Sequence, residues 1–500
     1  MPIYTKHPDY VANEKRVKKA RDINKGQEQM HAAGSTYLPV PSGMSDKNQK
    51  REDGSEYNDF DNYVARTPFF NASSRTIEAL TGLVASKNPS MEFPDRLEVI
   101  KENADLKGAT FEAYFELVLD DMVEVDRPGT LIDYPTLNPG EALTLEDKEA
   151  RNLRTRLCFY PRELIINWQE VTINNKTQWG RIVLKEITQV QKNADDIYEL
   201  TDRTQYRELY LDDAGIYRQR LWTRQDNDAD SGEGPDTYSP QEITPVIKGQ
   251  TLSEIPFILH VSSKNSRSAL EDLYVINIKH YQLSADCAHA EHFVCVPTPY
   301  IFGVNDTEVP DTFGPTNIWS AANPQANAGL IEFTGQGLQP VNDKLDRYEA
   351  QMGKLGARML MPEPGKGPET ATAEVIKSTG ELSALQKIVE ILNQDIKQIV
   401  NWIKRFEGLE VDDDAFFFRF SNELITSKLS AQEAVQLVTS WLQGAISKET
   451  LYYLLSKGGL TEPGVSFEDE QERIDNDPPP SLTSLDDEDE DEDDPEEDED

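Results

Sequence analysis

The stretch from Met361 to Gly408 constrains the fold of this chain more than any other. It opens with an irregular loop, 361–370, whose sequence MPEPGKGPET contains three prolines and two glycines. Proline lacks a backbone donor and fixes φ, so neither a helix nor a strand can include this loop. A long one-sided helical pattern follows, with apolar residues every three or four positions: Leu382, Leu385, Ile388, Val389, Leu392, Ile396, Ile399, Val400, Ile403 and Phe406.

This pattern predicts one long helix. Thr370 or Thr372 would cap its start, and Gly408 would end it in a left-handed conformation. About 36 residues would span roughly 55 Å at about 1.5 Å per residue. Gly380 lies inside the pattern and favours a kink. The predicted molecule is therefore elongated, or it is one slice of a larger assembly.

The chain is strongly acidic, with 50 basic and 90 acidic residues and a net charge of −40. Fourteen of the acids lie between Asp486 and Asp500, and the rest of the chain still carries −26 once these are taken away. A protein that holds nucleic acid by neutralising phosphates is basic. This chain is therefore predicted either to ignore nucleic acid or to meet it without holding it. The acidic tail fits a solubility brush, a docking tail for a basic partner, or an internal mimic of DNA.

Other bulk features narrow the class of protein. Five hundred residues predict two to four structural regions. No apolar run reaches the length of a membrane span, and the N-terminus has no apolar signal region, so a soluble, non-secreted protein is expected. The three cysteines, Cys158, Cys287 and Cys295, make no disulfide framework.

The first half of the chain predicts an α+β region. Residues 1–60 form a polar arm with a basic helix (Lys15, Arg16, Lys18, Lys19, Arg21, Lys25), interpreted as a solvated face rather than a nucleic-acid or partner-binding arm. Residues 61–266 begin with two helices, around 77–84 and, after an N-cap at Thr110, around 111–123. An antiparallel sheet follows, with strands at 164–168, 171–173, 178–188, 206–211, 216–223 and 257–261 and a polar loop at 225–240.

In the second half, two helices flank a small β-rich excursion. A capping box at Ser268–Glu271 starts the first helix, which ends by residue 295. Residues 296–340 contain short strands at 300–304 and 330–333, and a helix at 341–360 leads into the loop. Residues 371–427 hold the long helix and a strand at 415–420. Helices at 428–462 begin at a capping box, Ser430–Glu433, and at Ser447. Residues 463–500 are predicted to be disordered.

No motif in the sequence places catalytic or metal-binding groups together. Cys287, His289, His292 and Cys295 would spread over roughly 200° of one helix, so they are not expected to converge on a metal. Asp226, Asp228 and Asp230 resemble the start of a calcium loop, but Ser231 and Thr237 stand where glycine and glutamate are required. Gly365-Lys366-Gly367 lacks the spacing of a phosphate-binding loop. No cofactor is expected.

The order of these parts resembles the core of bacteriophage portal proteins, and in particular a group long catalogued as phage proteins of unknown function. The matching stretches are Tyr63–Asn71 with Leu80–Gly82, Gly129–Pro135, Tyr160–Trp168, Ala269–Tyr274 with His280–Asp286, Pro297–Pro299 with Gly303, and Glu369–Ala373. The resemblance runs from about residue 10 to 460 and does not include the acidic tail.

The resemblance implies a portal fold with wing (61–266), first stem helix (267–295), clip (296–340), second stem helix (341–360), tunnel loop (361–370), long wing helix and strand (371–427) and crown (428–462). It implies a dodecameric ring at one capsid vertex of the virion, assembled in the host cytoplasm, through which double-stranded DNA is packaged and ejected. The implied partners are the terminase large subunit, then a neck or adaptor protein, with the major capsid protein and a scaffolding protein around the ring. No membrane and no enzymatic activity are implied.

An acidic channel wall would keep DNA mobile, because each neutralised phosphate adds counterion-release free energy. Lys366 is the one cation in the loop 361–370, between Gly365 and Gly367. We expect Lys366 to project into the channel and to contact DNA phosphates without sequence preference, and the alternative is a solvated loop lysine. Two other functions remain open at this point: another phage head or neck structural protein, and a hydrolase that uses carboxylates of the β-rich region.

Overall fold

A computed structural model describes most of the chain. The described residues are 2–50, 56–135, 151–193, 196–224, 238–247, 250–263, 267–296, 298–305, 309, 320, 322–331, 335–360, 383–410, 416–422, 431–457, 460–461 and 465–476. The chain divides into two compact units, Met1–Asn422 and Glu423–Asp500. Within the described residues, no helix is long and apolar enough to cross a membrane.

A five-stranded antiparallel sheet forms one layer of the first unit, with strand order β10-β9-β8-β7-β6. Its strands are β6 (Ile165–Ile173), β7 (Lys176–Asn193), β8 (Asp196–Leu211), β9 (Tyr217–Arg224) and β10 (Tyr238–Ile243). The antiparallel sheet predicted from the sequence is confirmed. The predicted polar loop at 225–240 is wrong at its end, because Tyr238, Ser239 and Pro240 pair with β9. Pro240 fits there because β10 is an edge strand.

A second, smaller sheet joins this layer to the helices. It has the order β13-β4-β5, with β4 at Gly129–Asp133, β5 at Arg156–Tyr160 and β13 at Phe257–Leu259. Every residue of β4 is buried. Gly129 is required at its position, because a Cβ there would lie 2.2 Å from Cζ of the buried Phe257.

Helices α4 (Ala72–Ala85) and α6 (Phe111–Glu124) lie where the sequence predicts them. Thr110 caps α6 by accepting a hydrogen bond from the Ala113 amide. The rings of Phe93, Phe111, Phe115, Phe416 and Phe418 pack edge to face or tilted beside α6. This cluster joins α6 to a two-stranded sheet of β3 (Ser90–Glu92) and β16 (Phe417–Arg419). The predicted strand at 415–420 is confirmed in its centre.

Helix α11 spans Ala384–Glu407 and is shorter than predicted. Its end is confirmed, because Gly408 has a left-handed conformation with φ of 71°. The start predicted at Thr370 or Thr372 is wrong for this helix, because Ser383 is extended and caps α11 through a capping box with Gln386. A continuous kinked helix through residue 383 is therefore excluded. Thr370, Thr372 and Gly380 lie outside the described residues.

The N-terminal segment is part of the first unit rather than a separate arm. It contains α1 (Pro8–Asn24), α2 (Gln27–Ala33) and α3 (Asp59–Arg66). The basic helix is confirmed as α1, but the solvated face is wrong, because Arg16, Lys19 and Arg21 make ion pairs with acids of other elements. The shorter elements of this unit are η1 (Gly34–Thr36), β1 (Gln49–Lys50), β2 (Glu56–Tyr57), η2 (Asp95–Leu97), α5 (Glu98–Glu102), η3 (Arg162–Leu164), β11 (Val246–Ile247) and β12 (Gln250–Thr251).

The described residues of the second unit form three helices, α12 (Ala431–Leu442), α13 (Lys448–Lys457) and α14 (Phe467–Asn476). The two predicted helices of this region are confirmed. The prediction of disorder from residue 463 is wrong for 467–476, because α14 packs on α13 through the rings of Phe467 and Tyr452, whose centroids lie 5.7 Å apart. Residues 477–500 lie outside the described residues.

Candidate nucleic-acid interface

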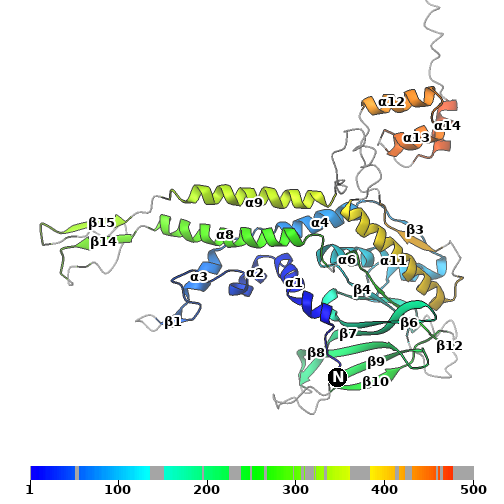
Figure 1. The fold of residues 1–500 in the computed structure, drawn as a ribbon, viewed down its shortest axis with the longest axis horizontal. Coiled ribbons are helices and arrows are strands. Elements are labelled where there is room, and N and C mark those ends of the chain that lie inside the picture. The colour runs from blue at the N-terminus through cyan, green and yellow to red at the C-terminus, as the bar shows by residue number, and fades with distance from the viewer. Residues whose placement is uncertain are drawn as a thin grey trace, which may run out of the picture. The chain divides into compact units, whose positions relative to one another are not determined.

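Two antiparallel helices, α8 (Glu271–Cys295) and α9 (Leu338–Arg358), pack against each other in the first unit. They lie side by side along most of their length (Figure 1). A hairpin of β14 (Thr298–Phe302) and β15 (Asn327–Ile331) connects them at one end. The helix–excursion–helix order predicted from the sequence is therefore confirmed. The predicted capping box is not formed, because the Ser268 hydroxyl accepts from the Leu270 amide and α8 begins at Glu271.

Polar contacts fix how α9 lies on α8. The Cys287 thiol donates to Oδ1 of Asn342 at 3.2 Å, and Nε2 of His280 lies 3.3 Å from Oε1 of Glu349. Burial lowers the pKa of His280, although Glu349 opposes this shift. Cys287 is buried and Cys295 is exposed, and no three His, Cys, Asp or Glu side chains within the described ranges could hold a metal ion.

Helix α8 is anchored on its other side by the N-terminal helices. The Asn277 amide donates to the Phe70 carbonyl at 2.8 Å and its oxygen accepts from the Ser73 hydroxyl at 2.9 Å. The Tyr63 hydroxyl donates to Asp286 at 2.9 Å. Since α8 is covered on two sides, it holds α9 in a fixed position on the unit.

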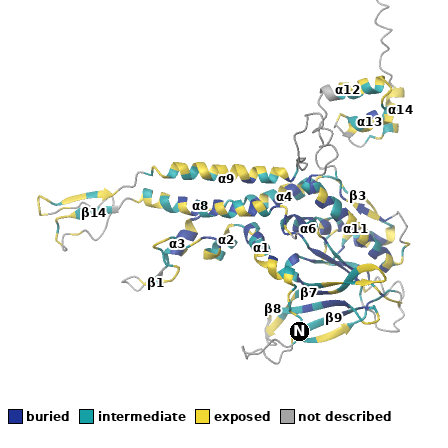
Figure 2. Ribbon diagram, viewed as in Figure 1, coloured by how far each residue is buried: buried dark blue, intermediate teal, exposed yellow. Residues whose placement is uncertain are grey.

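Helix α9, in contrast, is covered along one side. Met352 is the one buried residue within its bounds, and Figure 2 shows most of the helix in the colour of exposed residues. Near its C-terminal end Gly356 lies against Thr76 of α4, where a Cβ would approach Cγ2 of Thr76 to 3.0 Å. The face opposite to Met352 is left free along the helix.

Three cations lie on this free face. Arg347, Lys354 and Arg358 are exposed and fall within about 40° of the helix surface at 3.6 residues per turn. They extend over roughly 16 Å along the axis at about 1.5 Å per residue. None makes an ion pair or side-chain hydrogen bond with another described residue. In a chain with net charge −40, such a free cationic stripe is a distinct feature.

The opposite end of the same face is acidic. Asp343 and Asp346 are exposed there, one to four residues before Arg347. The face is therefore mixed in charge. Such a face can make only weak contacts with phosphate oxygens, because three cations release few counterions in total and nearby carboxylates oppose tight binding.

The predicted site residues Gly365, Lys366 and Gly367 lie outside the described residues, so their place in the molecule stays a prediction. The described residues on either side of 361–382 lie close together, because the Leu385 amide donates to the Met359 carbonyl at 3.1 Å. Sequence reasoning missed Arg347, Lys354 and Arg358, although their spacing of seven and four residues on a predicted helix places them on one stripe.

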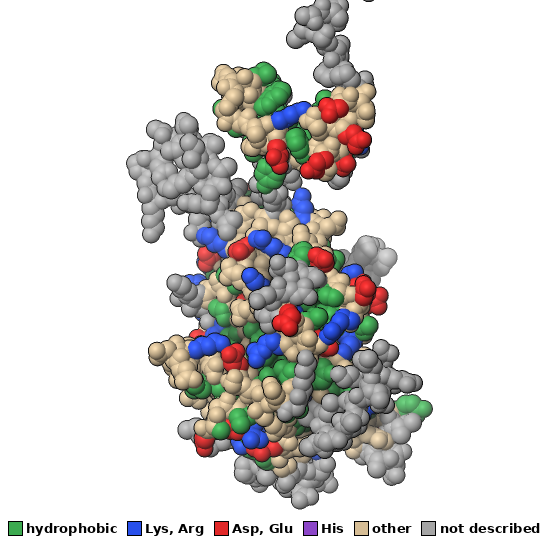
Figure 3. Space-filling view, turned by 90° about the vertical axis from the view of Figure 1, so that its right-hand side faces the viewer, with side chains coloured by type: hydrophobic (Ala, Val, Ile, Leu, Met, Phe, Trp, Pro, Cys, Tyr) green, Lys and Arg blue, Asp and Glu red, His purple; other side chains and the backbone are tan. Residues whose placement is uncertain are grey.

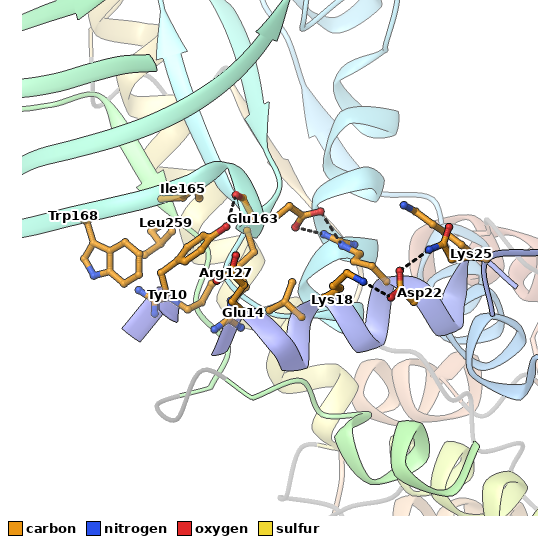
Figure 4. Close-up of a pocket in the computed structure, with 14 residues that line it drawn as sticks. Tyr10, Glu14, Lys18, Asp22, Lys25, Arg127, Glu163, Ile165, Trp168 and Leu259 are labelled. Carbon is orange, nitrogen blue, oxygen red and sulfur yellow. Dashed lines mark hydrogen bonds and ion pairs between the residues drawn. The ribbon is translucent and has the colours of Figure 1, made fainter. Parts of the chain in front are cut away.

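A second candidate site is a crevice of about 400 Å³ between α1 and the start of β6 (Figure 4). Its apolar end includes Tyr10, Ile165 and Trp168. At its charged end Arg21 pairs with Glu163 at 3.0 Å and also contacts Asp121 and Glu124. Burial raises the pKa of Asp121 to about 7, although Arg21 opposes this shift.

A hydrolase of the kind considered above would use a cluster of carboxylates. The contacts of these three groups therefore decide whether any pair of them can activate water. One guanidinium engages all three carboxyl groups, and Arg21 is itself largely buried. The arrangement is an ion-pair network that fastens α1 to α6 and η3. It does not present a carboxyl pair free to activate water.

Comparisons with known proteins give three results. Residues 269–407, which include α8, the hairpin, α9 and α11, match a family described as a domain of unknown function, DUF4055. This match covers less than a third of the chain. No curated protein matches the chain.

Two solved structures are similar to the chain at 10% identity. One is described as the neck of an empty GTA particle computed with C6 symmetry, with a TM-score of 0.35, covering 77% of this chain and 90% of that one. The other is the neck of a native GTA particle computed with C12 symmetry, with a TM-score of 0.35, covering 85% and 98%. A TM-score of 0.35 is too low to establish a shared fold, so neither similarity supports a statement about function.

Proposed function

We propose that this chain is a structural subunit that surrounds a pore for DNA, and more specifically that it is a bacteriophage portal protein. In this proposal copies form a ring at one capsid vertex, and DNA passes through the ring during packaging and ejection. The terminase large subunit and later a neck or adaptor protein bind the exposed β14–β15 end. The protein acts mechanically and not as an enzyme.

One observation carries this proposal. Helix α9 is held on one side by α8 and exposes a stripe of free cations on the other. A long helix with one free polar face suits a wall that faces water and a moving polyanion. Since the stripe holds three cations and the face also carries Asp343 and Asp346, contacts with phosphate would be brief. Lys366 would extend the stripe beyond Arg358 if its loop also faces the pore.

The proposal is tested by DNA binding of the purified ring at several salt concentrations. We expect wild-type rings to bind duplex DNA weakly, with a Kd on the order of 10⁻⁴ to 10⁻⁶ M as is typical of non-specific contacts. The triple variant Arg347→Glu, Lys354→Glu, Arg358→Glu should weaken binding and reduce the dependence of log K on log salt.

The single variant Lys354→Glu should act in the same direction, and it has a matched control that makes the same charge change elsewhere. Lys279 lies on α8, and Lys279→Glu should leave the salt dependence unchanged. Electron microscopy of the same samples should show a flanged ring with a central hole. A monomer in solution, or equal effects of the α9 and α8 variants, would contradict the proposal.

A further inference from the structure

Strands β7 and β8 extend well beyond the strands beside them (Figure 1). β7 has 18 residues and β8 has 16, whereas β6 has 9 and β9 has 8. The pairing of β6 with β7 ends at Ile165 and Leu184, although β7 continues to Asn193. From Lys185 to Val190, β7 therefore pairs with β8 on one side and with no described strand on the other.

The far part of β7 lacks the features that usually keep a free edge from pairing with a foreign strand. Proteins protect such edges with charged side chains, prolines or bulges. The edge strand β10 contains Pro240 and Glu242, and the part of β8 that extends beyond β9 contains Glu199 and Asp202. Residues Ile187–Val190 of β7 have neither a charge nor a proline. This stretch, which we call the open edge, can therefore accept a further strand.

A cleft of about 660 Å³ lies beside the start of the open edge. Its lining includes Lys185, Ile187 and Thr188 of β7, together with Leu117 of α6 and Lys107 in the segment before that helix. Leu117 and Ile187 are 47% and 54% exposed. Because one cleft combines part of a free strand edge with two exposed apolar side chains, a strand that pairs here would bury a side chain at the same time.

The charges of the cleft favour an acidic strand. On the face drawn in Figure 3, Lys and Arg side chains are scattered among Asp and Glu side chains, so a cation alone does not define a site. In the cleft, however, Lys107 and Lys185 form no ion pair with a described acid. The carboxylates that line it are already engaged, Asp105 by backbone amides, Asp133 by Arg156, and Glu186 by Arg207, Tyr160 and Gln205. The cleft therefore offers two positive charges without a counter-charge.

We propose that the open edge accepts an extended acidic segment of a partner protein as an added strand. The backbone of this segment pairs with β7, its acidic side chains meet Lys107 and Lys185, and an apolar side chain packs against Leu117 and Ile187. A helix would leave the backbone groups of the edge unpaired, and a polynucleotide has no apolar side chain for the cleft. The inference goes beyond the proposed pore, because neither the ring nor the passage of DNA requires this contact.

The test uses the purified full-length protein and a fluorescent ten-residue peptide in which glutamate alternates with valine. We expect saturable binding by fluorescence anisotropy, and much weaker binding of the same peptide with lysine in place of glutamate. Two further peptides are methylated at the odd or at the even backbone nitrogens. Since a strand directs alternate N–H groups to one side, one of these two should bind at least about tenfold more weakly than the other.

Charge variants test the two lysines of the cleft. The double variant Lys107→Glu, Lys185→Glu should weaken binding of the glutamate peptide at least about fivefold, because both attractive contacts become repulsive. The matched control is Lys15→Glu, Lys397→Glu, which makes the same change at two exposed lysines outside the cleft. This control should leave the affinity unchanged.

Hydrogen exchange locates the added strand. Alternate amides of the open edge donate to β8, so the peptide should slow exchange of the remaining amides of Ile187–Val190. The amides of β10, at the opposite edge of the sheet, should exchange as before.

Several results would overturn the inference. They are absence of peptide binding, equal binding of the lysine peptide, and equal affinities of the two methylated peptides. Slow exchange at the open edge without peptide, in the assembled protein and not in the monomer, would show that a second copy occupies it. Binding that appears when residues 136–150 are replaced by glycine and serine would show that the chain's own segment does. Each result leaves ring formation and DNA binding unaffected, so failure of this inference is distinct from failure of the proposed function.

Discussion

Arg21 gives the sharpest test of how the first unit is held together. Its side chain is 17% exposed and contacts Asp121, Glu124 and Glu163. Replacing it by methionine keeps the volume and removes the charge. Three carboxyl groups from α6 and η3 would then face one another without a counter-charge. Removing one partner of a buried ion pair costs about 3–5 kcal/mol, and we expect a loss of that size at pH 8.

The loss should depend on pH through Asp121, whose pKa is raised from 3.8 to about 7 by burial. A raised carboxyl pKa means that the folded state keeps its proton to higher pH than the unfolded chain, so stability falls as pH rises through this window. Arg21 lowers the pKa of Asp121, and removal of Arg21 should raise that pKa further. The stability lost in Arg21→Met should therefore increase above pH 7. If the pKa of Asp121 in the folded variant rises by about one unit, the free energy of unfolding falls by a further 1.4 kcal/mol, roughly.

The assay is urea unfolding at pH 6 and pH 8, combined with hydrogen exchange of the α1 amides. Lys18→Met is the matched control, because its ion pair with Asp22 is 66% exposed on the lysine side and should contribute less than about 1 kcal/mol. The double variant Arg21→Met, Asp121→Asn should lose most of the added pH dependence. A loss below about 1 kcal/mol for Arg21→Met, or the same loss at both pH values, would refute this reasoning.

Two further pairs of variants test the core by urea unfolding. Gly129→Ala should destabilise the protein by about 1–3 kcal/mol, because the new Cβ would meet Phe257 and Ile165. The control is Gly82→Ala in α4. Its Cβ meets nothing within 4 Å, so it should stabilise the protein by about 0.5–1 kcal/mol. Equal effects would contradict the packing described for β4. Asn393→Ala should cost about 2–4 kcal/mol, because the Asn393 side chain donates to the backbone carbonyl of the buried Phe420 and accepts from its backbone amide. The control, Gln398→Ala, changes an exposed residue of the same helix and should have little effect on stability. A neutral Asn393→Ala would show that water satisfies both groups.

Local signals predicted much of the fold. The helical period places α4, α6, α8 and α9, and a glycine in the left-handed region ends α11 at the predicted residue. Alternating and β-branched runs place β6 to β9. These features depend on neighbours within one turn or one strand, so the sequence contains them directly.

The features that were not predicted depend on distant partners. The cations of α1 suggested a solvated face, because the acids that bind Arg21 lie at positions 121, 124 and 163. The pairing of β3 with β16 joins residues more than 300 positions apart, and β3 has no strand pattern of its own. The early start assigned to the long helix ignored the capping box at Ser383 and Gln386, which competes locally with continuation of the helix.

In the candidate site, too, the features set by local sequence were predicted and those that depend on distant partners were not. The proline-glycine loop was recognised from composition, but its predicted contact, Lys366, stays a prediction because the loop lies outside the described residues. The stripe of Arg347, Lys354 and Arg358 becomes visible when the buried side of α9 is known, because periodicity alone does not show which cations find acidic partners.

The central claim is that α9 lines a pore in a ring of these chains, and a cryo-EM reconstruction of the purified full-length protein measures this directly. The account predicts a closed ring whose central hole is bordered by the face of α9 that carries Arg347, Lys354 and Arg358. A monomer, or a ring in which that face is buried against a neighbouring chain and away from the hole, would contradict it.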